Sequence, residues 1–238
     1  MVERDVVSII YNEKEEELYK AAANTIKNSI QDLLEKKEYV VFAIAGGRSV
    51  PYVFTLLKEK DIPWDKVHIF MVDDRMIPID EEGSNFKLAN DTFIKELVDK
   101  GKMPEANVHP YIYLKDDPDH GVPEYDEELK KYGGKFDIAL ISAGEDGHIG
   151  DLNPNHHSVE NESEMYIMMH DSPKPQKDRM TMSKKLLLKT EVVLLLFIGE
   201  EKKESFKKFI DQNISYKECP AKLVQRIMDS YTLTNIKA

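Results

Sequence analysis

The residues best suited to chemistry lie in one stretch, FDIALISAGEDGHIGDLNP, at residues 136–154. It begins with a short apolar run typical of a buried strand, and then presents Glu145, Asp146, Gly147 and His148 in consecutive positions. In a parallel α/β sheet, ligands bind at the carboxyl ends of the strands, and a histidine there can move a proton near neutral pH. The pattern indicates His148 as a general base. A polar loop with a solvated histidine is the alternative.

A general base needs a partner that orients its ring, and a carboxylate does so while stabilising the charged imidazolium. Asp146 is the nearest candidate in the sequence, and Asp151 is a second one. A histidine pair, His156 and His157, follows closely. Because no cysteine lies near this pair, we interpret it as solvent-exposed rather than metal-binding.

The segment AGGRSVP, at residues 45–51, lies between a predicted strand and a predicted helix. Gly46 and Gly47 allow backbone N–H groups to approach an anion closely, and the helix start adds partial positive charge. Arg48 and Ser49 are further donors. The alternative is a tight turn that requires glycine for steric reasons. The segment matches neither the P-loop nor the GxGxxG fingerprint, so nucleotide binding is not indicated.

Two acids and an arginine, Asp73, Asp74 and Arg75, follow directly after a second predicted strand. The planar guanidinium of Arg75 matches the geometry of a phosphate or carboxylate, and either acid can hold the arginine or bind substrate hydroxyls. The alternative is a surface ion-pair cluster. Ser84 and Asn85 come after a short acidic loop. Local features favour a helix cap there, and Asn85 is also a candidate for substrate binding.

Two later segments add cations. The proline-stiffened loop at residues 171–183 contains Arg179, a candidate for holding an anionic substrate. Gly199 ends another predicted strand, and Lys202 lies in the first turn of the helix that follows. A lysine opposes the helix dipole at this place, and a bound anion would resolve the mismatch.

Short apolar runs alternate with amphipathic segments along the chain, which predicts alternating strands and helices. The predicted strands are 39–45, 67–72, 136–142, 165–170, 179–183 and 191–198. The predicted helices are 13–36, 50–60, 85–99, 123–132, 183–189, 200–210 and 220–228. The alternation, without a convincing linker, predicts one α/β domain over residues 1–238. Its expected core is a doubly wound, mainly parallel sheet with helices on both faces.

The composition is that of an ordinary globular protein of 238 residues, with 41% hydrophobic and 32% charged residues. The net charge of −11 argues against a nucleic-acid partner, but not against a small anionic substrate, because the local field of a site matters more. The single cysteine, Cys219, allows no internal disulfide and no cysteine-rich metal site. No stretch approaches the ~20 apolar residues of a membrane helix. The N-terminus has no signal-peptide shape, so we expect a cytoplasmic protein without a membrane partner.

Several predicted strand ends thus present glycine, arginine, lysine and an acid beside a histidine. Such convergence is expected where a doubly wound sheet binds a phosphorylated small molecule. Neither a metal-ligand spacing nor a nucleotide signature accompanies it. We therefore expect no metal and no cofactor.

In five ordered blocks, the chain resembles the 6-phosphogluconolactonases, of the superfamily that also holds the glucosamine-6-phosphate deaminases. The blocks are AGGRSVP, DDRMIP with the later SN, GEDGHIGDLNP, DSPKP…RMTMS and GEEK, and they span most of the chain. The lactonase family typically shows a glycine pair followed by Ser-Thr-Pro, then Asp-Glu-Arg, Gly-x-Asp-Gly-His and a Ser-Pro-Lys-Pro…Arg loop. The resemblance implies a Rossmann-like fold. It also implies hydrolysis of 6-phospho-D-glucono-1,5-lactone to 6-phosphogluconate, in the oxidative pentose phosphate pathway.

The resemblance also implies roles for individual residues. His148 would activate water for attack on the lactone carbonyl, and Asp146 would orient the histidine or a substrate hydroxyl. The loop 46–49 would contribute backbone donors. The cations that would hold the phosphate or the sugar acid are Arg75, Arg179 and Lys202. A fused or associated glucose-6-phosphate dehydrogenase is a further partner that the resemblance implies.

Two segments depart from the family pattern. Arg48 interrupts the glycine loop, and its side chain either adds a phosphate contact or points to solvent. The segment Asp-Leu-Asn-Pro at residues 151–154 replaces the Ser-Leu-Phe-Pro that usually follows the histidine. The second change places polar groups near the predicted base.

Two alternative functions follow from the same residues. A deaminase also has DGHI followed by Asn-Pro, but deaminases place a glutamate five positions after the histidine, where this chain has Asn153. Their Asp-Glu-Tyr is replaced by residues 73–75, Asp-Asp-Arg, and both differences favour the lactonase. A non-catalytic sugar-phosphate sensor is the second alternative, and the retention of Asp146 and His148 argues against it.

Overall fold

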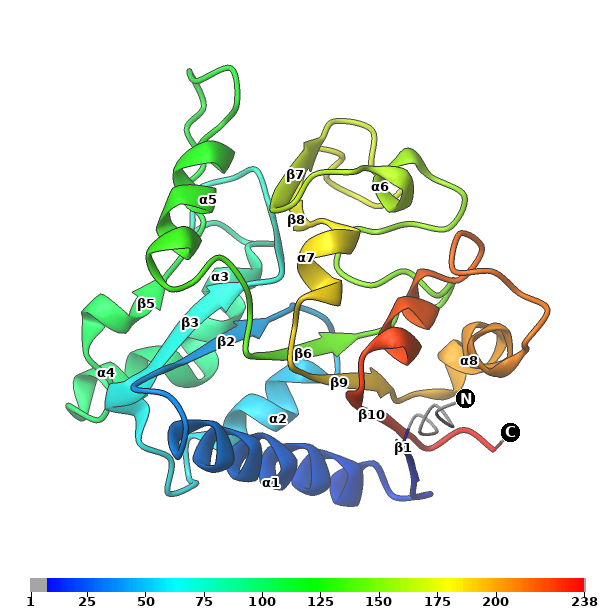
Figure 1. Cartoon of the computed structure of the whole chain (residues 1–238), viewed down its shortest axis with the longest axis horizontal. Coiled ribbons are helices and arrows are strands. Elements are labelled where there is room, and N and C mark those ends of the chain that lie inside the picture. Colours follow the sequence, from blue (N-terminus) through cyan, green and yellow to red (C-terminus); the bar gives the residue numbers. More distant parts are fainter. Residues whose placement is uncertain (1–7, 238) are drawn as a thin grey trace.

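The computed structural model describes residues 8–237. Seven strands form one parallel sheet in the order β1-β10-β9-β6-β2-β3-β5 (Figure 1). Its strands are β1 (Ser8–Tyr11), β2 (Val40–Ile44), β3 (Val67–Met71), β5 (Val108–His109), β6 (Ile138–Ser142), β9 (Val192–Phe197) and β10 (Asp229–Thr234). The predicted doubly wound, mainly parallel sheet is confirmed. The expectation about a signal peptide falls on the N-terminus, where residues 1–7 lie outside the described residues.

Helices cover both faces of this sheet. Figure 1 shows α1 and α2 below the sheet in that view, with α5 and α7 above it. The α-helices are α1 (Glu15–Leu34), α2 (Val50–Leu57), α3 (Asn85–Ala89), α4 (Lys95–Asp99), α5 (Val122–Lys131), α6 (His157–Glu160), α7 (Lys184–Leu188) and α8 (Lys203–Ile210). The 3-10 helices are η1 (Trp64–Lys66), η3 (Glu105–Asn107), η4 (Glu200–Lys202) and η5 (Pro220–Arg226). Within residues 8–237, none of the helices combines the length and apolar character needed to cross a bilayer.

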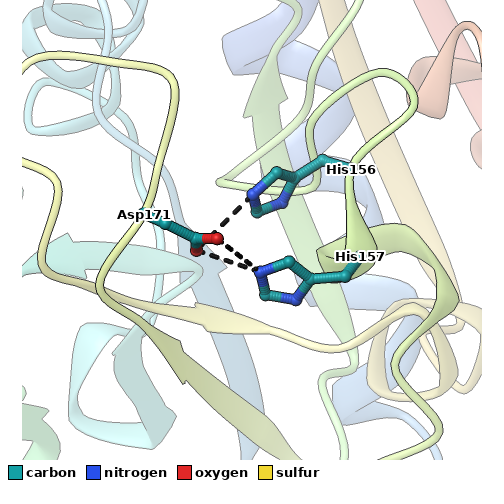
Figure 2. Close-up of side chains that lie close together, drawn as sticks. All are labelled: His156, His157 and Asp171. Atoms are coloured by element: carbon teal, nitrogen blue, oxygen red, sulfur yellow. Dashed lines mark hydrogen bonds and ion pairs between the residues drawn. The ribbon is translucent and has the colours of Figure 1, made fainter.

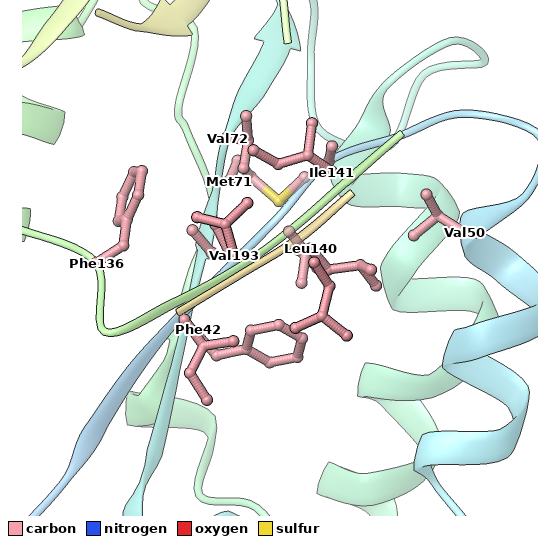
Figure 3. Packing of buried hydrophobic residues seen from close by; sticks show 14 of the residues in the cluster. Phe42, Val50, Met71, Val72, Phe136, Leu140, Ile141 and Val193 are labelled. Atoms are coloured by element: carbon pink, nitrogen blue, oxygen red, sulfur yellow. The ribbon is translucent and has the colours of Figure 1, made fainter. Parts of the chain in front are cut away.

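The core follows from the apolar runs. Every residue of β2, VVFAI, and of β9, VVLLLF, is buried, because helices cover both faces of the sheet. Phe42, Leu140 and Val193 come from the neighbouring strands β2, β6 and β9 and are part of one buried cluster (Figure 3). Helix α1 contacts β2, β6, β9 and β10. Its buried face includes residues spaced four apart, as an amphipathic helix requires: Leu18, Ala22, Ile26 and Ile30.

The order of the strands determines where a ligand binds. From β2 the chain adds β3 and β5 on one side, and then returns to add β6, β9 and β10 on the other. The strand order therefore reverses between β2 and β6. In open α/β sheets, ligands bind outside the carboxyl ends of the strands at such a switch point. The loops that follow β2 and β6 begin at this point.

A second, three-stranded antiparallel sheet lies beside the first, and the sequence predicts two of its strands but not the sheet itself. Its order is β4 (Asp73–Arg75), β8 (Arg179–Met182) and β7 (Tyr166–Met169). The strands β7 and β8 agree with the predicted segments 165–170 and 179–183. Strand β4 escapes prediction because DDR has no apolar residue, and only pairing with β8 makes it a strand.

The structure corrects two predicted helices and adds three further strands that the sequence does not predict. The pattern predicts a helix over 220–228, whereas the chain forms the 3-10 helix η5 followed by β10. The sequence of β10, DSYTLT, has no apolar run, so periodicity does not reveal it. The single helix predicted over 85–99 is divided by a π-helical turn, η2 (Asn90–Ile94), between α3 and α4. Strands β1 and β5 lie in segments without a strand prediction.

Candidate active site

A cavity of about 390 Å³ opens at the carboxyl ends of β2, β3, β6 and β9. Its size lies within the range of small-molecule sites, about 300–1,000 Å³. The predicted site residues that line it are Gly46, Gly47, Arg48, Asp73, Arg75, Asn85, His148, Arg179 and Lys202. Two others do not line it: Ser49 is buried at the start of α2, and Asp146 contacts His148 instead. The structure thus brings the side chains together, while their roles in binding and catalysis stay predictions.

His148 and Asp146 form the candidate catalytic pair. The Nδ1 of His148 lies 2.5 Å from Oδ1 of Asp146, and the Nζ of Lys174 donates a 2.5 Å hydrogen bond to Oδ2 of the same carboxylate. Because a carboxylate can only accept, we assign the proton of the neutral ring to Nδ1, which leaves a lone pair on Nε2. Burial alone raises the pKa of Asp146, but hydrogen bonds and charges from His148 and Lys174 outweigh it and hold the pKa well below its ordinary value. Asp146 is therefore ionised at neutral pH and stabilises an imidazolium.

The loop after β6 is shaped by glycine. A Cβ added at Gly144 would lie 2.0 Å from Cε1 of His148, so the imidazole packs directly against bare backbone. The N–H of Gly144 donates to the carbonyl of His148 at 2.9 Å and closes the turn. Gly147 has φ +96°, in the left-handed region that favours glycine. The sequence shows the break after the strand, but not that the imidazole of His148 packs against Gly144.

The two acids after β3, Asp73 and Asp74, have different roles. Asp74 accepts hydrogen bonds from the backbone N–H groups of Asn85 (2.7 Å) and Phe86 (2.9 Å), and from the hydroxyl of Ser84 (3.1 Å). It therefore anchors the start of α3, where Ser84 is the N-cap that the sequence predicts. Asp73 lines the cavity, and its carboxylate accepts from the side-chain amide of Asn85 at 3.1 Å.

Arg75 and Arg179 lie opposite each other in the small antiparallel sheet, on β4 and β8. Arg179 is buried; its Nε and Nη2 donate to backbone carbonyls of the preceding loop at 3.0 and 2.6 Å, and its Nη1 lies 3.7 Å from the carboxylate of Asp151. Burial raises the pKa of Asp73 to about 6, although the charges of Arg179 and Arg75 lower it. The two guanidinium groups thus bring two positive charges to the cavity, and Asp73 compensates them in part.

Lys202 provides a cation on the other side of the cavity. It is only 4% exposed, and its Nζ donates to the hydroxyl of Ser142 at 2.9 Å. Burial lowers the pKa of Lys202 to about 8; Glu201 opposes this shift, and the charge of Arg48 adds to it. No sequence signal indicated Ser142, because a small hydroxyl at the end of a strand is common.

The rim of the cavity carries an exposed ion-pair network. Arg48, whose side chain is 71% exposed, lies 2.6 Å from Glu145 and 3.1 Å from Glu201. Arg48 thus pairs with two acids and also lines the cavity, so a contact with the phosphate stays a prediction. Lys174 also lines the cavity and was missed, although the motif that contains it was recognised.

The histidine pair does not line the cavity and lies beside Asp171. The side chain of His157 is 59% exposed, as predicted, whereas that of His156 is only 16% exposed. The prediction that both are solvent-exposed is therefore wrong for His156, whose Nδ1 lies 3.0 Å from the hydroxyl of Ser158.

Comparisons with known proteins identify the family of this chain. A family model described as glucosamine-6-phosphate isomerases/6-phosphogluconolactonase matches residues 13–232. The chain is 32% identical to the 6-phosphogluconolactonase of Borreliella burgdorferi over 224 residues, which cover 92% of this chain and 95% of that protein. It is 29% identical to the 6-phosphogluconolactonase of Thermotoga maritima, over 74% of this chain and 77% of the relative.

Solved structures share the fold. The crystal structure of the Thermotoga maritima 6-phosphogluconolactonase has a TM-score of 0.80 at 24% identity, covering 96% of this chain and 98% of that one. A monomeric glucosamine-6-phosphate deaminase scores 0.79 at 20% identity, covering 95% and 96% of the two chains. The fold alone therefore does not separate the two activities. Together with the matched sequence over most of its length, it shows that the chain belongs to the family of glucosamine-6-phosphate isomerases and 6-phosphogluconolactonases.

Proposed function

We propose that this protein is a 6-phosphogluconolactonase, which hydrolyses 6-phospho-D-glucono-1,5-lactone to 6-phosphogluconate in the oxidative pentose phosphate pathway. The observation that supports it most directly is the pair of His148 and Asp146, at a cavity that also contains Arg75, Arg179 and Lys202. The two relatives named 6-phosphogluconolactonase support the same activity. They are 32% and 29% identical to this chain.

The His148–Asp146 pair can perform the hydrolysis by general base catalysis. Nε2 of His148 takes a proton from water as the water oxygen bonds to the lactone carbonyl carbon, and the carbonyl oxygen becomes an oxyanion. When the oxyanion collapses, the bond between the carbonyl carbon and the ring oxygen breaks. The imidazolium then returns its proton to the departing ring oxygen, and Asp146 stabilises the charged ring throughout.

The phosphate of the substrate fits best between the loop after β2 and Lys202. Within residues 8–237, none of the backbone hydrogen bonds of loops and turns uses the N–H of Gly46, Gly47 or Arg48. The hydroxyl of Ser142, which holds Lys202, lies 3.6 Å from the position of a Cβ added to Gly47, so the lysine and the loop are neighbours. Backbone N–H groups and a compact ammonium suit a phosphate.

A deaminase is less compatible with the residue five positions after the histidine. Asn153 is fully buried, and its side-chain amide donates to the carbonyl of Asp151 at 2.8 Å. It does not line the cavity and brings no carboxylate to it. Because deaminases place a glutamate at this position, Asn153 favours the lactonase.

The decisive experiment is a hydrolysis assay with freshly prepared 6-phosphogluconolactone, after subtraction of its spontaneous opening in water. We expect His148→Ala to lower kcat by about 10²–10⁴-fold, the usual contribution of general base catalysis. His170→Ala is the matched control, since His170 also pairs with a carboxylate, Asp178, at 2.7 Å but lies outside the cavity. A wild-type rate equal to the spontaneous rate, with tight binding of 6-phosphogluconate, would identify a sensor. Release of ammonia from glucosamine 6-phosphate would identify a deaminase.

A cytoplasmic location and an association with glucose-6-phosphate dehydrogenase, both expected from the sequence, stay predictions. The location can be tested by fractionating cells that produce the protein. The association can be tested by co-purification of the two enzymes.

A further inference from the structure

His156, His157 and Asp171 form a cluster that the proposed reaction does not use. The histidines lie at the start of α6, and Asp171 follows β7, so two separate segments meet here (Figure 2). Nε2 of His157 lies 2.9 and 3.1 Å from the two carboxylate oxygens, and Nε2 of His156 lies 3.5 Å from one of them. Both imidazoles thus direct the same ring nitrogen toward one carboxylate. Within residues 8–237, this is the only group of three or more His, Cys, Asp or Glu side chains spaced to hold a metal ion.

The spacing is that of a tetrahedral metal site. One ligand atom from each residue lies within 4.8 Å of the other two. Metal bonds of about 2.0–2.2 Å in tetrahedral geometry separate the ligand atoms by about 3.3–3.5 Å. His156 and Asp171 are already near this spacing at 3.5 Å, and His157 and Asp171, now 2.9 Å apart, would move slightly apart. Two imidazoles with one carboxylate are also a ligand set that zinc uses where a fourth position is left to water. The high exposure of Asp171 (63%) and His157 (59%) gives an ion access from solvent.

The surroundings of His156 favour a metal over a simple ion pair. Its Nε2 is buried, and it has no hydrogen-bond partner among residues 8–237. Its Nδ1 lies 3.0 Å from the hydroxyl of Ser158, the kind of contact that orients a metal-binding imidazole. The backbone N–H of Ser158 also lies 3.3 Å from this Nδ1, and a hydrogen bond from it would place the ring proton on Nε2. A metal on Nε2 requires the other tautomer, in which Nδ1 carries the proton and donates to the Ser158 hydroxyl. In that tautomer the buried lone pair of Nε2 has no hydrogen-bond donor among residues 8–237, and a metal would satisfy it.

We propose that His156, His157 and Asp171 bind a divalent transition-metal ion with the ligand preferences of Zn²⁺, with water as the fourth ligand. The ion joins α6 to the loop that begins at Asp171. That loop carries Lys174, whose Nζ donates to Asp146. The role of the metal is therefore structural, because it holds the loop that supplies a partner of the catalytic carboxylate.

The proposal can be tested by calorimetric titration of ZnCl₂ into the full-length protein after treatment with a chelator. We expect one Zn²⁺ per chain, and a loss of affinity of at least about 10-fold in His157→Ala and in Asp171→Asn, since loss of even an outer partner costs zinc sites this much. Both side chains are exposed, so these variants should fold, which circular dichroism checks. His170→Ala removes a histidine of similar exposure (53%) that is also paired with an acid, and it should bind Zn²⁺ as the wild type does.

Two further measurements separate this site from the catalytic pair. His148→Ala should keep its Zn²⁺ affinity, and Zn²⁺ should slow hydrogen exchange of the backbone amides at residues 171–178 in the wild type but not in His157→Ala. The proposal is overturned if the wild type binds no Zn²⁺, or if His157→Ala and His170→Ala bind it equally. It is also overturned if His148→Ala, but not His157→Ala, loses binding. An excess of Mg²⁺ should not reduce the binding of Zn²⁺, because Mg²⁺ prefers oxygen ligands.

Discussion

At the residue scale, the site depends on buried or half-buried charges whose partners hold them in one protonation state. Asp146 stays ionised because His148 and Lys174 both bind its carboxylate. Lys202 is buried with the hydroxyl of Ser142 as its hydrogen-bond partner, which is uncharged and leaves the charge of the lysine uncompensated by this contact. A phosphate is therefore a natural counter-charge for this lysine.

The lowered pKa of Lys202 predicts a pH dependence of ligand binding. With a pKa of about 8, the ammonium is present below this pH and is lost as the pH rises through it. We expect the affinity for 6-phosphogluconate to weaken above pH 8, as measured by calorimetry between pH 7 and about 9.5, where the phosphate itself does not titrate. Lys202→Met should bind more weakly and show no such step. An affinity that is independent of pH in the wild type would contradict the assignment.

Substitution of Asp146 by asparagine tests the orientation of the base. The amide would keep the size of the side chain but lose the negative charge that stabilises the imidazolium. We expect Asp146→Asn to lower kcat by about 100-fold or more, while KM changes little because Asp146 does not line the cavity. Steady-state kinetics measure both values. Asp178→Asn, which changes the pair with His170 outside the cavity, should leave both values unchanged.

At the element scale, the loop between β6 and α6 positions the base. Two features shape it: the hydrogen bond from the N–H of Gly144 to the carbonyl of His148, and the left-handed backbone at Gly147. The strand end supplies a rigid start, since every residue of β6 up to Ile141 is buried. The position of the imidazole is therefore a property of the loop backbone as well as of its partner acid.

Replacement of Gly144 by alanine tests this packing. The added Cβ would lie 2.0 Å from Cε1 and 2.1 Å from Nδ1 of His148, so the ring must move. We expect Gly144→Ala to reduce kcat by about 100-fold, the cost of a displacement of about 1 Å in a catalytic group. Gly101→Ala is the control for kcat, because Gly101 does not line the cavity and nothing lies within 4 Å of its added Cβ. Its φ of +67° makes this variant less stable, but should leave kcat unchanged. A fully active Gly144→Ala variant would show that His148 does not need to pack against Gly144 to act as the base.

At the scale of the whole molecule, the cavity forms where two sheets meet. The large sheet contributes the loops after β2 and β6, and the small sheet contributes Arg75 and Arg179. Two hydrogen bonds of 2.8 Å join the sheets: one from the N–H of Met182 to the carbonyl of Val72, and one from the hydroxyl of Tyr166 to the carbonyl of Met71. The geometry of the arginines relative to the base depends on this junction.

The junction can be weakened by Tyr166→Phe, which removes the buried hydroxyl and leaves the ring. We expect the free energy of unfolding to fall by about 1–3 kcal/mol, because a buried carbonyl loses a hydrogen bond. The affinity for 6-phosphogluconate should also fall, since β7 pairs with the strand that carries Arg179. Denaturant unfolding and calorimetry measure the two effects. Tyr52→Phe, at a 59% exposed tyrosine, should change neither.

The sequence determined much of the site because strand ends in a parallel sheet share one edge. Apolar runs identified β2, β3, β6 and β9, and the motif residues after them had to meet once these strands were parallel. Strands without an apolar run could not be predicted in this way. The strands β4 and β10 have no apolar run. They are strands only because β4 pairs with β8, and β10 pairs with β9 and β1.

The sequence by itself therefore decided the parallel sheet and the loops that carry the glycines, the acids and His148, because hydrophobic periodicity and glycine are local signals. Only the tertiary structure decided which acid serves the base, that Asp74 caps a helix, and that Asp171 faces two histidines. Asp74 and Asp171 meet partners more than ten positions away in the chain. The choice of Asp146 as partner of His148, two positions away, depends on side-chain directions that no local pattern encodes.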